Sequence, residues 1–152
     1  MRISAKADYA IRAAVELADT DEKKPIKGEV LAEAQGIPLQ FLEHILLELK
    51  HARLVRARRG ARGGYWLAQP PEDITLANVI RAVEGPLANI QDQAPEQTKY
   101  PGNAEQLSEV WIAVRASLRR VLENVTIADL RDGKIPADVI ALTRDEGARI
   151  TR

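Results

Sequence analysis

The chain has 152 residues, which is the length of one compact domain or of one domain with an appendage. Its 22 Lys and Arg balance 22 Asp and Glu, and 45% of its residues are hydrophobic, a composition typical of globular rather than disordered proteins. It contains no cysteine, which excludes a disulfide scaffold, a thiolate nucleophile, and a zinc or iron–sulfur site with thiolate ligands. It shows neither a membrane-spanning apolar run nor the apolar stretch of a signal peptide, so we expect a cytoplasmic protein with no membrane partner.

The zero net charge conceals an uneven distribution. Residues 1–68 carry 12 basic against 9 acidic side chains, whereas residues 69–152 carry 10 against 13. Residues 50–62 form a basic run without any acid, consisting of Lys50, Arg53, Arg56, Arg58, Arg59 and Arg62. Such a run is either a solvated face or a stripe that binds phosphates, and its surroundings in the fold decide between the two.

The first predicted helix covers about residues 4–18. Apolar residues recur there at three- and four-residue steps, as on one buried helix face, and Ser4 is a suitable N-cap. A polar loop over residues 19–25 follows. A short helix over 27–35 then ends at Gly36, and Pro38 opens another helix that runs to about His51. Helix, tight turn and helix predict a helix-turn-helix, whose second helix can enter a DNA major groove.

Two short strands are predicted directly after the helix-turn-helix. Residues 54–58 alternate apolar and basic side chains, residues 60–64 form a glycine-rich turn, and residues 65–68 return as the second strand. A hairpin in this position is the wing of a winged helix. The unit ends near Gln69-Pro70-Pro71.

The second half of the chain begins with a helix over 76–83 that Thr75 caps. Residues 84–106 contain three prolines, two glycines and no regular periodicity, which predicts a long loop. From Leu107 to Val125 apolar residues step by four and three, the pattern of a helix that packs along another helix. Thr126 to Asp129 resembles a capping box that starts one more short helix.

These elements predict a mainly α fold with a small β-hairpin. We divide it into a winged helix-turn-helix domain over 1–84, a loop over 85–106, a long helix with a short following helix over 107–135, and a polar tail over 136–152.

Several of these segments together resemble one family. They are the opening Met1-Arg2-Ile3-Ser4-Ala5-Lys6 with Tyr9-Ala10, the helix-turn-helix over 35–43, the wing from Leu54-Val55 to Gly63-Gly64-Tyr65, and the stretches 74–85 and 126–130. This combination resembles the bacterial winged-helix regulators of the IscR, NsrR and CymR family over about 130 residues.

The resemblance implies a homodimeric transcription factor whose long C-terminal helices pair and whose wings flank the DNA. On this chain the dimer interface would consist of Leu107, Trp111, Val114, Leu118 and Val121. Members with a [2Fe–2S] cluster carry three cysteines in the loop that corresponds to 84–106, and this chain has none there. The remaining resemblance is to cluster-free members such as CymR, which serve cysteine and sulfur metabolism. We therefore expect no cofactor.

The recognition helix supplies the candidates for reading bases. Gln40 suits adenine, Glu43 can accept from cytosine N4, and Pro38 or Leu39 can touch a thymine methyl group. His44 is a further candidate on the same helix. Leu39 is equally well explained as a core residue, and the others as an ordinary solvated helix face.

The wing supplies candidates for the DNA backbone and the minor groove. Arg59 and Arg62 flank glycines, among them Gly63, that allow close backbone approach, and arginine favours a narrowed minor groove. Phosphate contacts are assigned to Lys6, Arg56 and Arg58.

Two other groups of residues are candidates, one for a metal site and one for a small-molecule site. His44 and His51 lie seven residues apart on one helix, roughly 10.5 Å along its axis, so they cannot share a metal ion within one protomer. We predict no metal site. Tyr100 and Trp111, with residues 99–103 between them, are a candidate small-molecule effector site after the long loop.

Taken together, the sequence predicts a homodimeric DNA-binding regulator, a repressor that recognises a palindromic operator in double-stranded DNA. The chain has three serines, no G-x-S-x-G and no phosphate-binding glycine motif, so we expect no enzyme. The alternative is a winged helix that makes protein contacts, with the basic run as a solvated face.

Overall fold

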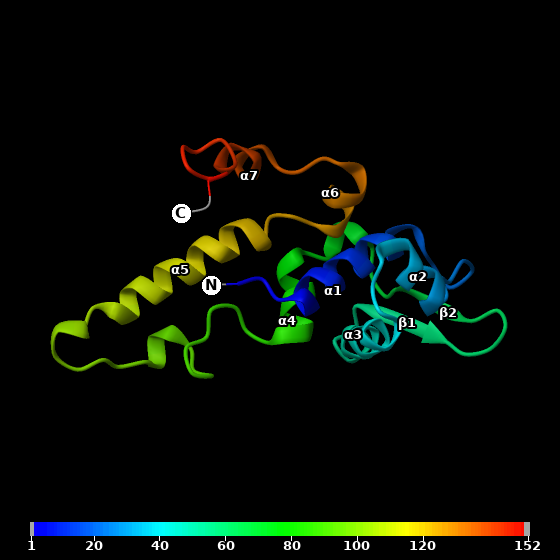
Figure 1. Ribbon diagram of the computed structural model, residues 1–152, viewed down its shortest axis with the longest axis horizontal. Coiled ribbons are helices and arrows are strands. Elements are labelled where there is room, and N and C mark those ends of the chain that lie inside the picture. The colour runs from blue at the N-terminus through cyan, green and yellow to red at the C-terminus, as the bar shows by residue number, and fades with distance from the viewer. Residues whose placement is uncertain (1, 151–152) are drawn as a thin grey trace.

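The computed structural model describes residues 2–150 (Figure 1). The predicted fold class is confirmed, because the described chain is mainly helical with one antiparallel hairpin. The elements in chain order are α1 (Ala5–Glu16), α2 (Gly28–Gln35), α3 (Leu39–His51), β1 (Val55–Arg58), β2 (Gly64–Leu67), α4 (Leu76–Glu84), α5 (Leu107–Leu122), α6 (Ile127–Asp132) and α7 (Ala137–Leu142).

Local chemistry sets the helix ends. The Ser4 hydroxyl accepts a hydrogen bond from the backbone N–H of Ala7 at 3.0 Å and starts α1. Gly36 ends α2 in the left-handed conformation with φ of 62°, which glycine adopts without steric cost. Thr75 and Thr126 each form a complete capping box at the start of α4 and α6. The predicted caps of α1, α2, α4 and α6 are thereby confirmed.

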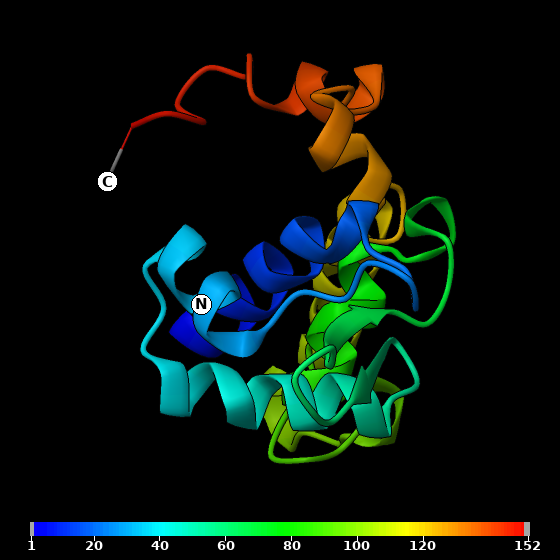
Figure 2. The same cartoon turned by 90° about the vertical axis from the view of Figure 1, so that its right-hand side faces the viewer.

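The core lies between α1, α2, α3 and α4. The helix α3 buries one full face, since Leu42, Ile45, Leu46 and Leu49 have no exposed surface. Alanines of α1 belong to the same core cluster and allow close approach of the two helices. Figure 2 shows α1 lying beside α3. The opposite face of α3 stays exposed to solvent as a result.

The hairpin is attached to the segment before α2. Val55 pairs with Leu67 and Arg58 with Gly64, so the register leaves residues 59–63 as the turn. An isolated bridge joins Ile26 to Tyr65 through hydrogen bonds of 2.9 and 2.7 Å. The wing is therefore fixed relative to α2 and does not depend on its turn alone.

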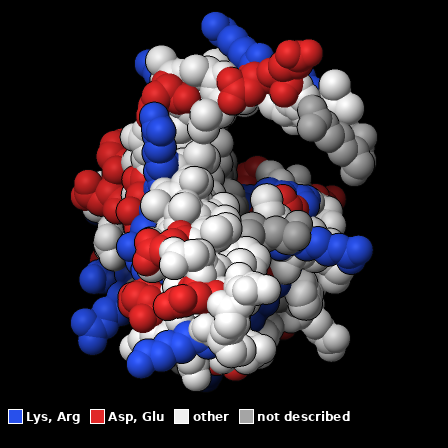
Figure 3. All heavy atoms as spheres, turned by 90° about the vertical axis from the view of Figure 1, so that its left-hand side faces the viewer, with Lys and Arg blue, Asp and Glu red and all other residues white. Residues whose placement is uncertain are grey.

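The C-terminal arm, residues 137–150, projects from the rest of the chain. It follows α6 and turns back over α5 in Figure 1, and Figure 3 shows an open hollow beneath it. None of its residues is buried. The sequence predicts a polar tail over 136–152 and assigns no helix to it; in the structure residues 137–142 of this tail form α7, with Pro136 at the N-cap. The predicted tail residues 151–152 and Met1 lie outside the described residues.

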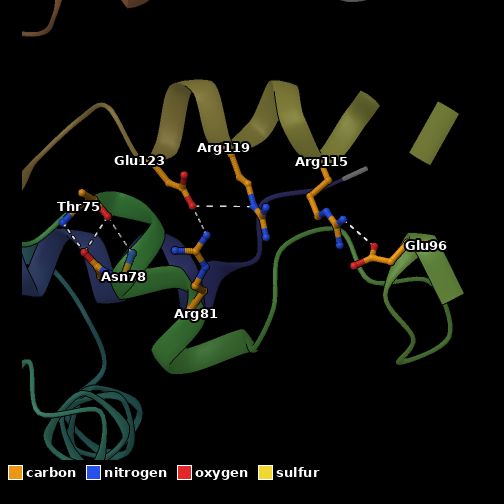
Figure 4. A network of polar contacts seen from close by, with 7 residues as sticks. All are labelled: Thr75, Asn78, Arg81, Glu96, Arg115, Arg119 and Glu123. Atoms are coloured by element: carbon orange, nitrogen blue, oxygen red, sulfur yellow. Dashed lines mark hydrogen bonds and ion pairs between the residues drawn. The ribbon is translucent and has the colours of Figure 1, made fainter. Parts of the chain in front are cut away.

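Two kinds of contact join α5 and α6 to the winged domain. The backbone N–H of Leu76 donates to Val125 at 3.0 Å and that of Ile127 donates to Ile74 at 2.8 Å, around a bridge between Thr75 and Thr126. Figure 4 shows the ionic contact of the second kind, in which Arg81 of α4 bonds Glu123 after α5. In the same view Arg115 joins α5 to Glu96 of the loop before it, which lies outside the winged domain.

The long loop before α5 is more ordered than its composition suggests. Two short 3₁₀ turns, Pro95–Gln97 and Gly102–Ala104, interrupt it. Ala88, Gln91 and Asp92 adopt positive φ, and Gln91 and Asp92 are the central residues of a tight turn bridged by Ile90 and Gln93. Among the described helices, none has both the length and the apolar composition that crossing a membrane requires.

Candidate DNA-binding surface

The exposed face of α3 carries most of the predicted base-reading residues. Burial of Leu42, Ile45, Leu46 and Leu49 on one face turns the rest of the helix outward. Gln40, Glu43 and His44 are exposed there, as is Pro38 at the start of the helix. Leu39 is half-buried and packs against the core, which favours the core explanation for this residue.

Two glycines shape the wing. A Cβ at Gly63 would lie 2.0 Å from the carbonyl oxygen of Arg58, so only glycine fits where the turn folds back on β1. A Cβ at Gly64 would lie 2.6 Å from the carbonyl oxygen of Ile26, at the bridge that attaches the wing. The turn is further held by Lys27, whose Nζ donates to the carbonyl of Gly60 at 3.2 Å.

A hollow of about 440 Å³ lies between α3 and the wing, and we call it the α3–wing hollow. Of the predicted DNA-binding residues it brings together Glu43, Arg58, Arg59 and Gly63. The other lining residues that carry a charge or an exposed apolar group are Lys27, Glu29, Leu47 and Lys50. Four basic side chains against two acidic ones give this hollow a positive balance, which suits a polyanion.

Lys27, Leu47 and Lys50 were missed as site residues. Lys50 belongs to the basic run, and Leu47 and Lys50 follow Glu43 by four and seven residues, so helical spacing places all three on one face. This helical spacing could have predicted Leu47 and Lys50 as part of the same surface as Glu43. Lys27 offered no comparable signal, because it reaches the wing only through the tertiary fold.

Arg58 is engaged within the protein. Its guanidinium donates to the backbone carbonyl of Glu22 at 3.0 Å and lies 5.9 Å from the ring centroid of Trp66. Its Nη1 also lies 3.8 Å from the carboxylate of Glu22. These contacts hold the loop before α2 against the hairpin, so the Arg58 side chain supports the wing as well as bordering the hollow.

The remaining basic candidates are distributed around this surface. Arg59 and Arg62 are exposed on the wing turn. Arg56 borders a second hollow with Lys50, Arg53 and Trp66. Lys6 lies apart from these, because its Nζ contacts the carboxylate of Glu48 at 2.8 Å and joins α1 to α3.

Tyr65 lies at the floor of the α3–wing hollow. Burial raises the pKa of its hydroxyl above the ordinary value, and the carboxylates of Glu43 and Glu29 raise it further. The hydroxyl therefore stays protonated at neutral pH, in a hollow that Glu43 of the recognition helix also lines.

The predicted effector residues are not brought together. Tyr100 borders a hollow with Lys99, Glu105 and Ser108, and Trp111 is not part of its lining. Trp111 is half-buried, and its Nε1 is a buried donor that lacks a hydrogen-bond acceptor within the described residues.

The predicted dimer residues form one stripe along α5, and the chain itself covers part of this stripe. Leu118 borders a hollow against the chain's own Gly85–Asn89, so it faces its own protomer. Val114 and Val121 lie four residues before and three residues after Leu118, so they adjoin it on the helix surface, and both are half-exposed. Leu107 is half-buried at the start of α5.

The architecture and surface described above define a winged helix-turn-helix protein. A family profile, Rrf2, described as "Iron-dependent Transcriptional regulator", matches residues 3–133, which is most of the chain and ends before α7. The chain belongs to the Rrf2 family of transcriptional regulators.

Relatives and solved structures agree with this assignment. The chain is 47% identical to an HTH-type regulator from Mycobacterium tuberculosis strain H37Rv over 98% of this chain and 92% of the relative. It is 32% identical to the HTH-type transcriptional regulator CymR of Bacillus subtilis over 86% of this chain and 89% of CymR. The solved structure of CymR, described as the global cysteine regulator of B. subtilis, superposes with a TM-score of 0.72 at 30% identity and covers 88% and 98% of the two chains. T. potens IscR superposes with a TM-score of 0.70 at 32% identity and covers 88% of each chain.

The residues of this chain do not fit the iron group that the family description implies. A thiolate-ligated cluster requires cysteines, and the chain has none. Among residues 2–150, no three His, Cys, Asp or Glu side chains are grouped as a metal ion would require. His44 is exposed, with its Nε2 at 3.9 Å from the Oε1 of Glu48, and His51 is the last residue of α3.

Proposed function

We propose that the chain is a homodimeric repressor that binds a two-fold operator through α3 and the wing. The observation that supports this most directly is the α3–wing hollow, where an exposed recognition helix and arginines of a rigid turn border one positively charged surface. Two such surfaces related by a two-fold axis match a palindromic site. The proposed role is binding of chromosomal DNA in the cytoplasm, and the names of the relatives as transcriptional regulators support it.

The contacts divide by their chemistry. Glu43 and Gln40 are proposed to read base edges, because their side chains project from the exposed face of α3. Arg59 and Arg62 are proposed for the minor groove, and Arg56 and Lys50 for phosphates. Lys6 and Arg58 support the fold through Glu48 and Glu22 and are secondary candidates.

The proposed signal comes from cysteine and sulfur metabolism. The likeness to CymR, described as a global cysteine regulator, supports control of genes for cysteine and sulfur metabolism. Since the chain lacks cysteine, the signal does not reach it through a thiolate-ligated cluster.

The test is selection of genomic fragments with the purified protein, followed by binding measurements at several salt concentrations. The expected fragments contain a two-fold sequence, and log affinity falls steeply and linearly with log salt because several phosphates are neutralised. A flat salt response, or no enrichment of any fragment, would refute DNA binding and favour a winged helix used for protein contacts. Repression is tested on a reporter that carries the selected operator.

A further inference from the structure

The C-terminal arm leaves apolar side chains without partners in its own protomer. Leu142 is 43% exposed and Ile150 is 64% exposed, and Val139 and Ile140 are half-exposed on α7. Within residues 2–150, the side-chain hydrogen bond that joins the arm to the rest runs from Asn124 to the carboxylate of Asp138, at 2.9 Å. A short helix held by one polar contact is marginal unless its apolar face is covered.

The helix α5 presents a second uncovered surface toward the arm. Arg115 and Arg119 point toward the chain's own α4 and loop in Figure 4. At 3.6 residues per turn, the opposite side of α5 carries small and apolar side chains, and we call it the outward face. Its small and apolar residues are Val110, Ala113, Val114, Ser117 and Val121, and Arg120, one heptad after Ala113, lies at its edge. Val110 is 52% exposed, and no residue of α5 is buried.

The arm lies on the side of α5 that carries the outward face. Asn124 continues the outward face by helical spacing, and its bond to Asp138 places the start of α7 at that end of α5. Figures 1 and 2 agree that α7 lies over the C-terminal half of α5, and Figure 3 shows the hollow beneath the arm. A helix with its side chains is about 10–12 Å wide. We therefore consider a helix as the element that lies between the outward face and the apolar side chains of the arm.

We propose that the arm of each protomer closes over α5 of a second copy, so that the partner's α5 lies between the outward face and the arm. This proposal rests on the proposed homodimer and defines how it is assembled. By two-fold symmetry each arm covers the other chain's helix, which makes the contact reciprocal. The dimer would then bury the apolar residues that each protomer leaves exposed.

The size of a stable interface supports a second copy as the occupant. A stable protein–protein interface takes about 800 Å² and about 20–30 residues from each partner. The helix α5 has 16 residues, and one side of it is used against the chain's own loop through Arg115 and Glu96. The outward face alone therefore falls short of such an interface. The arm, which is continuous with α5 through α6, supplies the missing surface.

The absence of cysteine makes the proposal directly testable by cross-linking. Chains with two different tags are mixed, one carrying Leu142→Cys and the other carrying Val110→Cys, Ala113→Cys or Ser117→Cys, and are then oxidised. We expect one or more of the three α5 positions to form the hetero-disulfide at least tenfold above a control pair of Leu142→Cys with Arg62→Cys on the wing. A chain with both Leu142→Cys and Ser117→Cys shows whether the arm instead bonds its own α5.

A second variant removes the dependence on disulfide geometry. Leu142→Asp should weaken the dimer at least tenfold by placing a charge in the interface, with unchanged helix content because Leu142 is exposed in the protomer. Ala137→Asp adds the same charge on another side of α7 and should change the dimer dissociation constant less than about twofold.

The two proposals fail in different ways. A monomeric mass for the unmodified chain in solution would overturn the homodimer and, with it, the arm contact. A dimeric mass together with background cross-linking and no effect of Leu142→Asp would overturn the arm contact alone. A disulfide formed only within the double-cysteine chain would do the same.

Discussion

The winged domain and the C-terminal half differ in how much of their apolar surface the protomer covers. In α3 four consecutive inward positions, from Leu42 to Leu49, have no exposed surface. In α5 and α7 no residue is buried, although both carry apolar residues. The winged domain is therefore complete within one chain, whereas the C-terminal half has the composition of an interface that a further surface must cover.

This difference matches two tasks. A surface that binds DNA needs side chains held in place before binding, and a packed core beneath α3 provides this. A helix that assembles with another must keep its apolar face available, at a cost in exposed surface while the chain is alone. The following predictions test how far the two regions behave independently.

The largest effect is expected for Leu46→Ala in α3. Leu46 is fully buried in the core, so its truncation leaves a cavity and should lower the free energy of unfolding by about 2–5 kcal/mol. Val114→Ala in α5 should change it by less than about 0.5 kcal/mol at protein concentrations that keep the chain monomeric. Urea unfolding at two protein concentrations measures both. Equal losses for the two variants would contradict the proposed division.

The next effect is expected for Gly63→Ala in the wing. The added Cβ would lie 2.0 Å from the carbonyl oxygen of Arg58, so the turn must open. We expect operator affinity to fall at least tenfold, because Arg59 and the turn lose their position relative to α3. Ala61→Gly, at an exposed position of the same turn, is the matched control and should leave affinity nearly unchanged. Binding of Gly63→Ala at full affinity would show that the wing does not touch DNA.

The fold could be predicted where a local pattern determines it. Ser4, Thr75 and Thr126 cap helices through hydrogen bonds to residues three positions away, and Gly36 ends α2 through its own backbone conformation. Such signals are contained within a few residues of sequence. The heptad spacing of α5 likewise identified a long helix that ends near its predicted limit.

The DNA-binding surface could be predicted only in part, because the tertiary fold determines which group each basic side chain contacts. Lys6 was predicted to contact a phosphate. In the structure its ammonium group donates a hydrogen bond to Glu48, which lies 42 residues away in sequence. Arg58 was predicted to contact a phosphate as well. Its guanidinium donates a hydrogen bond to the backbone carbonyl of Glu22, which lies 36 residues away in sequence. Lys27 was overlooked because it reaches Gly60 from 33 residues away. No spacing rule reports contacts of this kind.

A smaller and more selective effect is expected for residues of the DNA surface. Arg59→Ala should weaken binding by about 1–3 kcal/mol on every sequence and reduce the salt slope by about one. Glu43→Ala should change base preference more than overall affinity, since the carboxylate is proposed to accept from cytosine N4. Fluorescence anisotropy on the selected operator and on single-base variants separates the two. Equal losses on all sequences for both variants would refute the base-reading role of Glu43.

The smallest effect is expected at the contact between the two regions, where Arg81 of α4 bonds Glu123 after α5. The Arg81 guanidinium lowers the pKa of the Glu123 carboxyl below its ordinary value near 4.5, and Arg119 adds to this effect. A carboxyl whose pKa is lowered by folding stabilises the folded state above its unfolded pKa, and this contribution is lost as the pH falls through the folded value.

Glu123→Gln should therefore be slightly less stable than the parent chain at pH 6–8, with the difference shrinking below about pH 5. The effect is small because Glu123 is exposed and solvent screens the pair, and salt should reduce it further. Glu105→Gln, at an exposed carboxylate without an ion pair in residues 2–150, is the matched control for removing one exposed negative charge. A difference in the free energy of unfolding that stays constant down to pH 3 would mean that Glu123→Gln acts through packing. The ion pair between Arg81 and Glu123 would then not contribute to the contact between the two regions.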